Sequence, residues 1–116
     1  MNTLDALEEL LSSLAPTVFH VSENQPIPYI QLIQLPGVPT GRSWESIDRV
    51  QIDIYANGYD PAKDLAHEAS QILTGYANTS QGLIDQLEAE IPFWHEATES
   101  DTINKFSATY LVTYRH

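Results

Sequence analysis

The feature that most constrains this fold is one continuous stretch, residues 50–70, which reads VQIDIYANGYDPAKDLAHEAS. Its first part alternates apolar and polar residues, the period of a strand with one buried face; the apolar members are Val50, Ile52 and Ile54. Its second part begins an apolar stripe at helical spacing, which comprises Ala62, Leu65, Ala66, Ala69, Ile72, Leu73 and Tyr76. The stretch therefore predicts a strand, a tight turn and a helix that packs on the sheet.

Turn-forming and helix-capping residues mark the ends of this predicted helix. The pair Asn57-Gly58 favours a turn directly after the strand. Asp60 is the expected N-cap, and Pro61 suits the first helical position, where no N–H is needed. Gly75 is expected to end the helix, followed by a polar loop over residues 77–82.

The N-terminal half outside this unit predicts one more helix, two strands and a long loop. A leucine stripe over residues 3–14 predicts an amphipathic helix that Pro16 ends. Residues 17–21 and 29–35 are rich in β-formers, and the second run is apolar on both faces, as in a central strand. Residues 36–46 (PGVPTGRSWES) carry two prolines and two glycines, which predicts a loop of about a dozen residues.

The C-terminal part contains one ambiguous segment and one clear strand. Residues 83–98 (LIDQLEAEIPFWHEAT) are ambiguous between a helix and a strand, and the β-formers from about residue 86 favour the strand, with Pro92 indicating an edge or a bulge. In the strand reading Leu87, Ala89, Ile91 and Phe93 share one face. Residues 105–115 alternate clearly and are expected to pair with this segment as a hairpin. The predicted fold is α+β: residues 1–116 form one domain, a mostly antiparallel sheet of four to five strands with two helices on one face.

Charge and composition exclude several classes of function. The formal net charge is −11, which argues against gripping nucleic acid or anionic lipid. Cysteine is absent, which excludes disulfides and thiolate metal sites. The His67-Glu68 and His95-Glu96 pairs lack the second histidine, four residues after the first, of a zinc-protease helix. We therefore expect no enzyme, no catalytic residue, no metal and no cofactor.

Two groups of residues are candidates for interaction. Arg42 and Trp44 in the predicted loop are residue types enriched at interface hot spots, and Trp94 is a third candidate; the alternative is that Trp44 folds back onto the sheet. Carboxylates gather between residues 85 and 101, among them Asp85, Glu88 and Glu90. Such a run is either an ordinary solvated face or a patch that repels a polyanion.

The whole pattern resembles one known family. A leucine-striped helix precedes two strands, VQIDIYA (50–56) turns into AKDLAHEASQIL (62–73), and FSATYLVTYR (106–115) closes the chain. This arrangement is similar to the tail-terminator, or tail-completion, proteins of long-tailed bacteriophages. The resemblance implies a homo-oligomeric ring, of six copies in that family, which caps the finished tail tube, ends its polymerisation and meets the head connector.

The same resemblance implies partners and roles for the candidate residues. The partners would be further copies of the chain, the tail-tube protein and a head-completion protein, with DNA passing through without specific binding. The 36–46 loop, with Arg42 and Trp44, would contact a neighbouring copy or the tube. Asp85, Glu88 and Glu90 would line the channel and keep phosphates from adhering.

Two other interpretations remain open. The chain could be another head–tail neck or completion protein, or a small α+β ligand-binding domain with a closed pocket. The first segment has no basic start and is interrupted by acids, and no long apolar run follows, so neither a signal peptide nor a membrane span is predicted. We expect synthesis in the host cytoplasm and a final location in the virion, at the head-proximal end of the tail.

Overall fold

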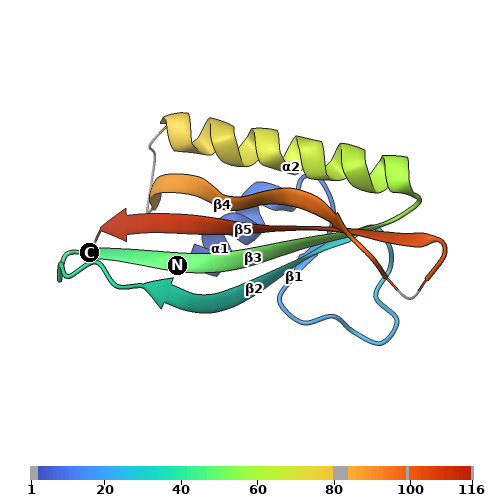
Figure 1. Ribbon diagram of the computed structural model, residues 1–116, viewed down its shortest axis with the longest axis horizontal. Helices are drawn as coiled ribbons and strands as arrows, with labels where there is room; N and C mark the ends of the chain where they lie inside the picture. The colour runs from blue at the N-terminus through green and yellow to red at the C-terminus, as the bar shows by residue number, and fades with distance from the viewer. Residues whose placement is uncertain (1–2, 80–83, 99, 116) are drawn as a thin grey trace.

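A five-stranded sheet with the strand order β1-β2-β3-β5-β4 forms the centre of the molecule. The computed structural model describes residues 3–79, 84–98 and 100–115. Its elements in chain order are α1 (Thr3–Leu11), β1 (Thr17–Val18), β2 (Tyr29–Val38), β3 (Glu45–Asn57), α2 (Tyr59–Thr79), β4 (Ile84–Glu96) and β5 (Ile103–Arg115). β1 runs parallel to β2, and every other pair is antiparallel. The predicted α+β class, with one mostly antiparallel sheet and two helices packed on it, is confirmed (Figure 1).

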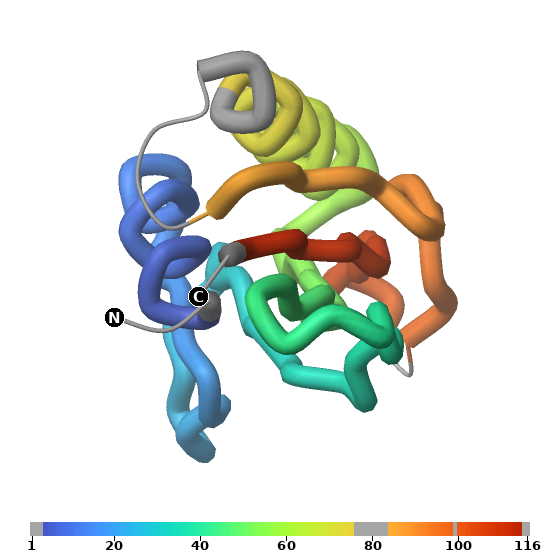
Figure 2. The backbone as a smooth tube through the Cα atoms, turned by 90° about the vertical axis from the view of Figure 1, so that its left-hand side faces the viewer, coloured from blue at the N-terminus to red at the C-terminus, as the bar shows by residue number. Residues whose placement is uncertain are grey.

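The predicted strand–turn–helix unit forms the middle of the core. Val50, Ile52 and Ile54 of β3 are fully buried. On the neighbouring strand β5 they lie opposite Tyr110, Ala108 and Phe106. Five residues of the α2 stripe are buried against this face: Ala62, Leu65, Ala66, Ala69 and Leu73. α2 runs lengthwise along the sheet beside β4 (Figure 1). α1 adds its leucines to the same core and contacts both α2 and β2 (Figure 2). We call this side of the sheet the helix-bearing face and the opposite side the helix-free face.

The predicted dozen-residue loop over 36–46 is wrong, because β2 and β3 extend into it. The two strands form a long hairpin joined by residues 39–44, with a register shift between Leu35 and Val38. Gly37 lies within this irregularity, and a Cβ at its position would be 2.7 Å from the carbonyl oxygen of Ile47. Proline and glycine suggested a loop because they usually interrupt strands, but an irregular strand also accommodates them.

Several predicted helix and strand boundaries also need correction. α1 ends at Leu11 instead of residue 14, and β1 is two residues long where five were predicted. α2 begins at Tyr59, so Asp60 lies in its first turn and Gly58 (φ 97°) precedes the helix, its carbonyl accepting the first helical hydrogen bond from Ala62. Gly75 does not end α2, which continues to Thr79; a glycine within a helix costs about 1 kcal/mol, which the packed apolar face offsets.

The strand interpretation of the ambiguous segment is confirmed, and so is the expectation of an edge or bulge near Pro92. β4 is an outer strand of the sheet, paired with β5 along a register that shifts at three places. These shifts overturn the predicted apolar face of β4, since Ala89 is exposed and Ile91 is 48% exposed. Leu83, Glu99 and His116 lie outside the described residues.

Candidate interaction surfaces

The helix-free face carries a buried polar network that the sequence did not reveal. Asp53 lies on this side of β3, where an acid in an alternating strand is ordinarily solvated, yet it is only 2% exposed. Its carboxylate accepts hydrogen bonds from the hydroxyl of Ser107 (2.6 Å) and from the amide nitrogen of Gln51 (2.9 and 3.1 Å). The side chains of Ser107 and Gln51 therefore replace water around this charged group.

Lys105 connects this network to the edge of the sheet. Its ammonium lies 3.0 Å from the carboxylate of Glu96 and 3.7 Å from that of Asp53. Burial lowers the pKa of Lys105, but the hydrogen bond to Glu96 and the charges of Asp53 and Tyr55 outweigh it, so the net pKa is raised. Lys105 therefore remains charged at neutral pH and holds β4 to β5 through side chains.

Two stacked tyrosines continue the network on β2 and β3. Tyr29 and Tyr55 lie opposite each other, with ring centroids 4.6 Å apart and planes 19° apart. Burial, followed by the neighbouring charges of Tyr55 and Asp53, raises the pKa of the Tyr29 hydroxyl, while Lys105 partly opposes this. This part of the helix-free face is thus a fixed structural feature of the fold.

β4 presents an exposed patch on the helix-free face, formed by Glu88, Ile91 and Trp94. They lie opposite Leu111, Thr109 and Ser107 of the neighbouring strand β5, three alternate residues that share the helix-free side. A regular strand would place residues 88, 91 and 94 on alternating faces, and the register shifts bring all three to one face. Ile91 and Trp94 are 48% and 49% exposed. We call these three residues the edge patch.

The three carboxylates proposed from the sequence to line a channel all lie exposed on β4. Glu90 forms a two-pronged ion pair with Arg49 of β3, at 2.9 and 3.1 Å, so it connects β4 to β3 across β5. Glu88 has no ion pair among the residues that the structure describes. Asp85 lies at the first register shift, between Ile84 and Gln86. These three carboxylates therefore have different environments, which the sequence alone did not distinguish.

Arg42 and Trp44 lie together in the hairpin tip, residues 39–44, which joins β2 to β3. The guanidinium of Arg42 is 5.4 Å from the ring centroid of Trp44, a cation–π distance. Trp44 is 47% exposed, so it does not fold back into the core, and the Arg42 side chain is 59% exposed. Arg42 also pairs with Glu45 at 3.6 Å, and Thr40 hydrogen bonds within the same turn.

The structure does not bring Trp94 together with Arg42 and Trp44. Trp94 is level with Ser107, which is level with Asp53. Between Asp53 and Trp44 the extended chain of β3 covers about 30 Å at roughly 3.4 Å per residue. The three candidate interface residues therefore belong to two separate surfaces, at the tip and on the edge.

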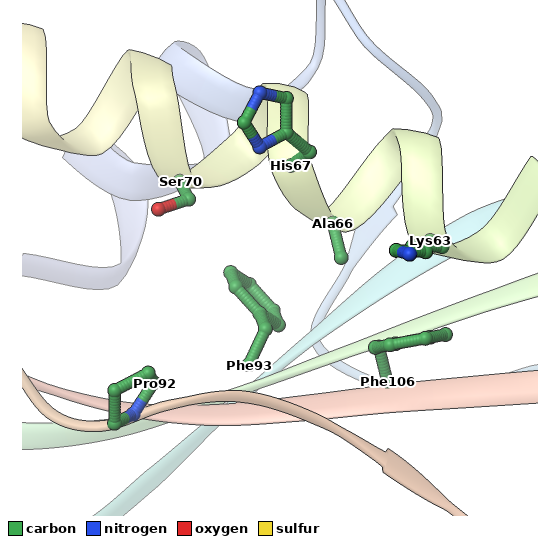
Figure 3. Close-up of a pocket in the computed structure, with 7 residues that line it drawn as sticks. All are labelled: Lys63, Ala66, His67, Ser70, Pro92, Phe93 and Phe106. Atoms are coloured by element: carbon green, nitrogen blue, oxygen red, sulfur yellow. The ribbon is translucent and has the colours of Figure 1, made fainter.

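An open groove of about 280 Å³ separates α2 from β4 on the helix-bearing side (Figure 3). Phe93 and Phe106 form its apolar floor, and Lys63, His67 and Ser70 of α2 line the other side. His95 lies nearby, where its ring contacts Phe106 and its Nε2 is 3.0 Å from Asn104 Oδ1. Within the described ranges no three His, Cys, Asp or Glu side chains are placed to hold a metal ion.

Comparison with solved structures adds one finding to this geometry. The chain is similar to a chain in a structure described as the virion of a native gene transfer agent particle. The TM-score is 0.58, and the match covers 98% of this chain and 95% of that chain at 11% identity. The two chains therefore share one fold over nearly their whole lengths. No family model matches the sequence, and no curated protein matches it.

The two helices can be compared with the length and hydropathy that a membrane span requires. Neither α1 nor α2, as far as their residues are described, is long and apolar enough to cross a bilayer.

Proposed function

We propose that this chain is a structural protein of a phage-like particle, and that it caps the finished tail tube as an oligomeric ring. The observation that carries the proposal is the likeness over almost the full length of both chains to a component of a gene transfer agent virion. The strand–helix pattern that resembles tail terminators supports the narrower assignment. In this role the ring ends polymerisation of the tube and offers the head-completion protein a surface to join.

The exposed surfaces suit assembly better than catalysis. Half-exposed tryptophans at the hairpin tip and on the edge patch are residues that protein interfaces favour. On the helix-free face, Asp53, Lys105 and Glu96 are engaged in mutual ion pairs, and Asp53 also accepts a hydrogen bond from Ser107. The proposed role is therefore mechanical, and it requires neither a cofactor nor a metal.

A channel for DNA gives the acidic surface a purpose. We propose that the helix-free face of the sheet turns toward this channel, with Glu88, Glu90 and Asp85 near its wall. Carboxylates there would repel the phosphates of passing DNA, so the DNA would slide without specific binding. The finished protein would then be located in the virion, at the head-proximal end of the tail.

The groove beside α2 is the observation that favours a ligand-binding function instead. It is open to solvent, and its volume lies at or below the range of sites that enclose a small molecule. Its apolar floor would bind a side chain of a partner as readily as a free ligand. We therefore place this function behind the structural one.

Electron microscopy of particles produced after deletion of the gene for this chain tests the proposal. A missing terminator leaves tails of excessive and variable length, and supplying the chain separately restores uniform length. Tails of normal length that fail to join heads would identify a neck protein instead. Normal, infectious particles would refute any structural role.

A further inference from the structure

The hairpin tip and the edge patch have opposite chemical character. Residues 39–44 contain Arg42 and Trp44 and no acidic residue. β4 contains Asp85, Glu88, Glu90 and Glu96 and no lysine or arginine. Each surface also presents an exposed tryptophan, so charge and apolar area are paired on both.

The spacing of the two surfaces also matches. Glu88 and Ile91 lie opposite Leu111 and Thr109, alternate residues of β5, so they are about 7 Å apart along the strand. In the tip the guanidinium of Arg42 lies 5.4 Å from the ring of Trp44. If Arg42 of one copy contacts Glu88 of another, the indole of Trp44 therefore lies over the side chains of Ile91 and Trp94.

A single copy cannot make this contact with itself. Glu88 is level with Leu111, and Leu111 with Arg49. From Arg49 to Trp44 the strand extends about 17 Å, and β5 separates β3 from β4 by about two strand spacings of roughly 4.8 Å. The tip points away from this region at the end of the sheet (Figure 1). The partner is therefore another copy.

The charges of the chain favour Arg42 as the group that makes the contact. Arg49 and Lys105 are engaged in ion pairs within the sheet. The pair of Arg42 with Glu45 is long, at 3.6 Å, and exposed on the arginine side, so it contributes little in water. Glu88, which lacks an ion pair among the described residues, gains a partner at little cost.

We propose that the hairpin tip of one copy docks on the edge patch of the next, with Arg42 facing Glu88 and Trp44 packing on Ile91 and Trp94. Because the two surfaces differ, the contact is head-to-tail, and its repetition closes a ring when the rotation permits. The inference rests on the proposed function, which calls for a ring, and adds which surfaces build it. Glu88 then lies at the seam between neighbouring copies, where it pairs with Arg42 and no longer adds to the repulsion of DNA proposed for the channel.

Charge reversal tests the contact by sedimentation velocity over a range of concentrations. Arg42→Glu and Glu88→Arg should each weaken self-association by at least about tenfold, and the double variant should restore most of it. Glu88→Arg reduces the net charge from −11 to −9. This weakens the general repulsion between copies, which by itself would strengthen association. Weakening by this variant is therefore a specific result.

Matched controls change the same charge on α2, which faces the other side of the sheet. Asp64 and Glu68 are exposed there and do not line the groove, so Asp64→Arg and Glu68→Arg should leave self-association close to that of the unmodified chain. A double variant no better than the weaker single variant overturns the proposal, and so do single variants that associate normally.

The proposed function is tested separately from these surfaces. A ring that survives both single reversals refutes the tip–edge contact and leaves the capping role intact. An unmodified chain that stays monomeric at every concentration also refutes the contact, and its binding to isolated tail tubes then decides the capping role alone.

Discussion

The buried carboxylate of Asp53 supports a quantitative prediction about stability. Replacement by alanine removes the acceptor for the hydroxyl of Ser107, which is 5% exposed and cannot turn to water. An unsatisfied buried donor costs about 1–3 kcal/mol, and a hydrogen bond to a charged acceptor contributes about 1.5–3 kcal/mol. Lys105 keeps its ion pair with Glu96, and Gln51 is half-buried, so its amide can reach water.

Asp53→Ala should therefore lower the free energy of unfolding by about 2–4 kcal/mol, after allowing for the relieved cost of burying the charge. This is a large part of the roughly 5–15 kcal/mol typical of a domain. Urea unfolding followed by far-UV circular dichroism and tryptophan fluorescence measures the change. Asp64→Ala on the exposed side of α2 is the matched control and should stay within about 0.5 kcal/mol.

A double-mutant cycle identifies the cause. If the Asp53–Ser107 hydrogen bond carries the effect, Ser107→Ala should cost much less in the Asp53→Ala background than in the unmodified chain. The coupling should be about 1 kcal/mol or more. An Asp53→Ala variant as stable as the control, or two additive losses, would refute the reasoning.

Three further predictions concern the backbone and the titratable groups. Gly37→Ala should destabilise the chain by about 1–3 kcal/mol in thermal unfolding, because its Cβ would meet the carbonyl oxygen of Ile47 at 2.7 Å; unchanged stability would contradict the described hairpin. Gly75→Ala should stabilise it by about 0.5–1 kcal/mol, since the site is helical and nothing lies within 4 Å of the added Cβ; a loss would mean that α2 ends there. The raised pKa values of Lys105 and Tyr29 mean that the native state holds protons longer than the unfolded state, so stability is intact below about pH 10 and falls as the pH rises further. Alkaline unfolding midpoints check this, and Tyr29→Phe should flatten the decline.

The elements with regular periodicity could be predicted from the sequence, because burial alone explains them. The alternation of β3 and the stripe of α2 each follow one geometric repeat, and Val50, Ile52 and Ile54 of β3 and five residues of the stripe between Ala62 and Leu73 are buried where that repeat places them. The hairpin over 36–46 could not be predicted in this way. Its proline and glycine lie in an irregular part of β2, where pairing with β3 compensates for their poor strand propensity.

The candidate surfaces were predicted in part, for a related reason. Arg42 and Trp44 could be named because they stand out in a polar segment, and the structure places both exposed at one tip. The edge patch could not be predicted, because register shifts in β4 put Glu88 and Ile91 on one face against the usual alternation. The burial of Asp53 could not be predicted, because Ser107 and Lys105, which contact its carboxylate, are distant in sequence.

The irregular register of β4 has a consequence for how copies can polymerise. A straight outer strand offers a row of free N–H and C=O groups, on which another chain can add a strand and grow into a fibril. Pro92 removes one donor from β4, and three register shifts interrupt the repeat. Backbone-templated growth is thereby blocked, which leaves side-chain recognition, a reversible and self-limiting kind of contact, to govern association at this edge.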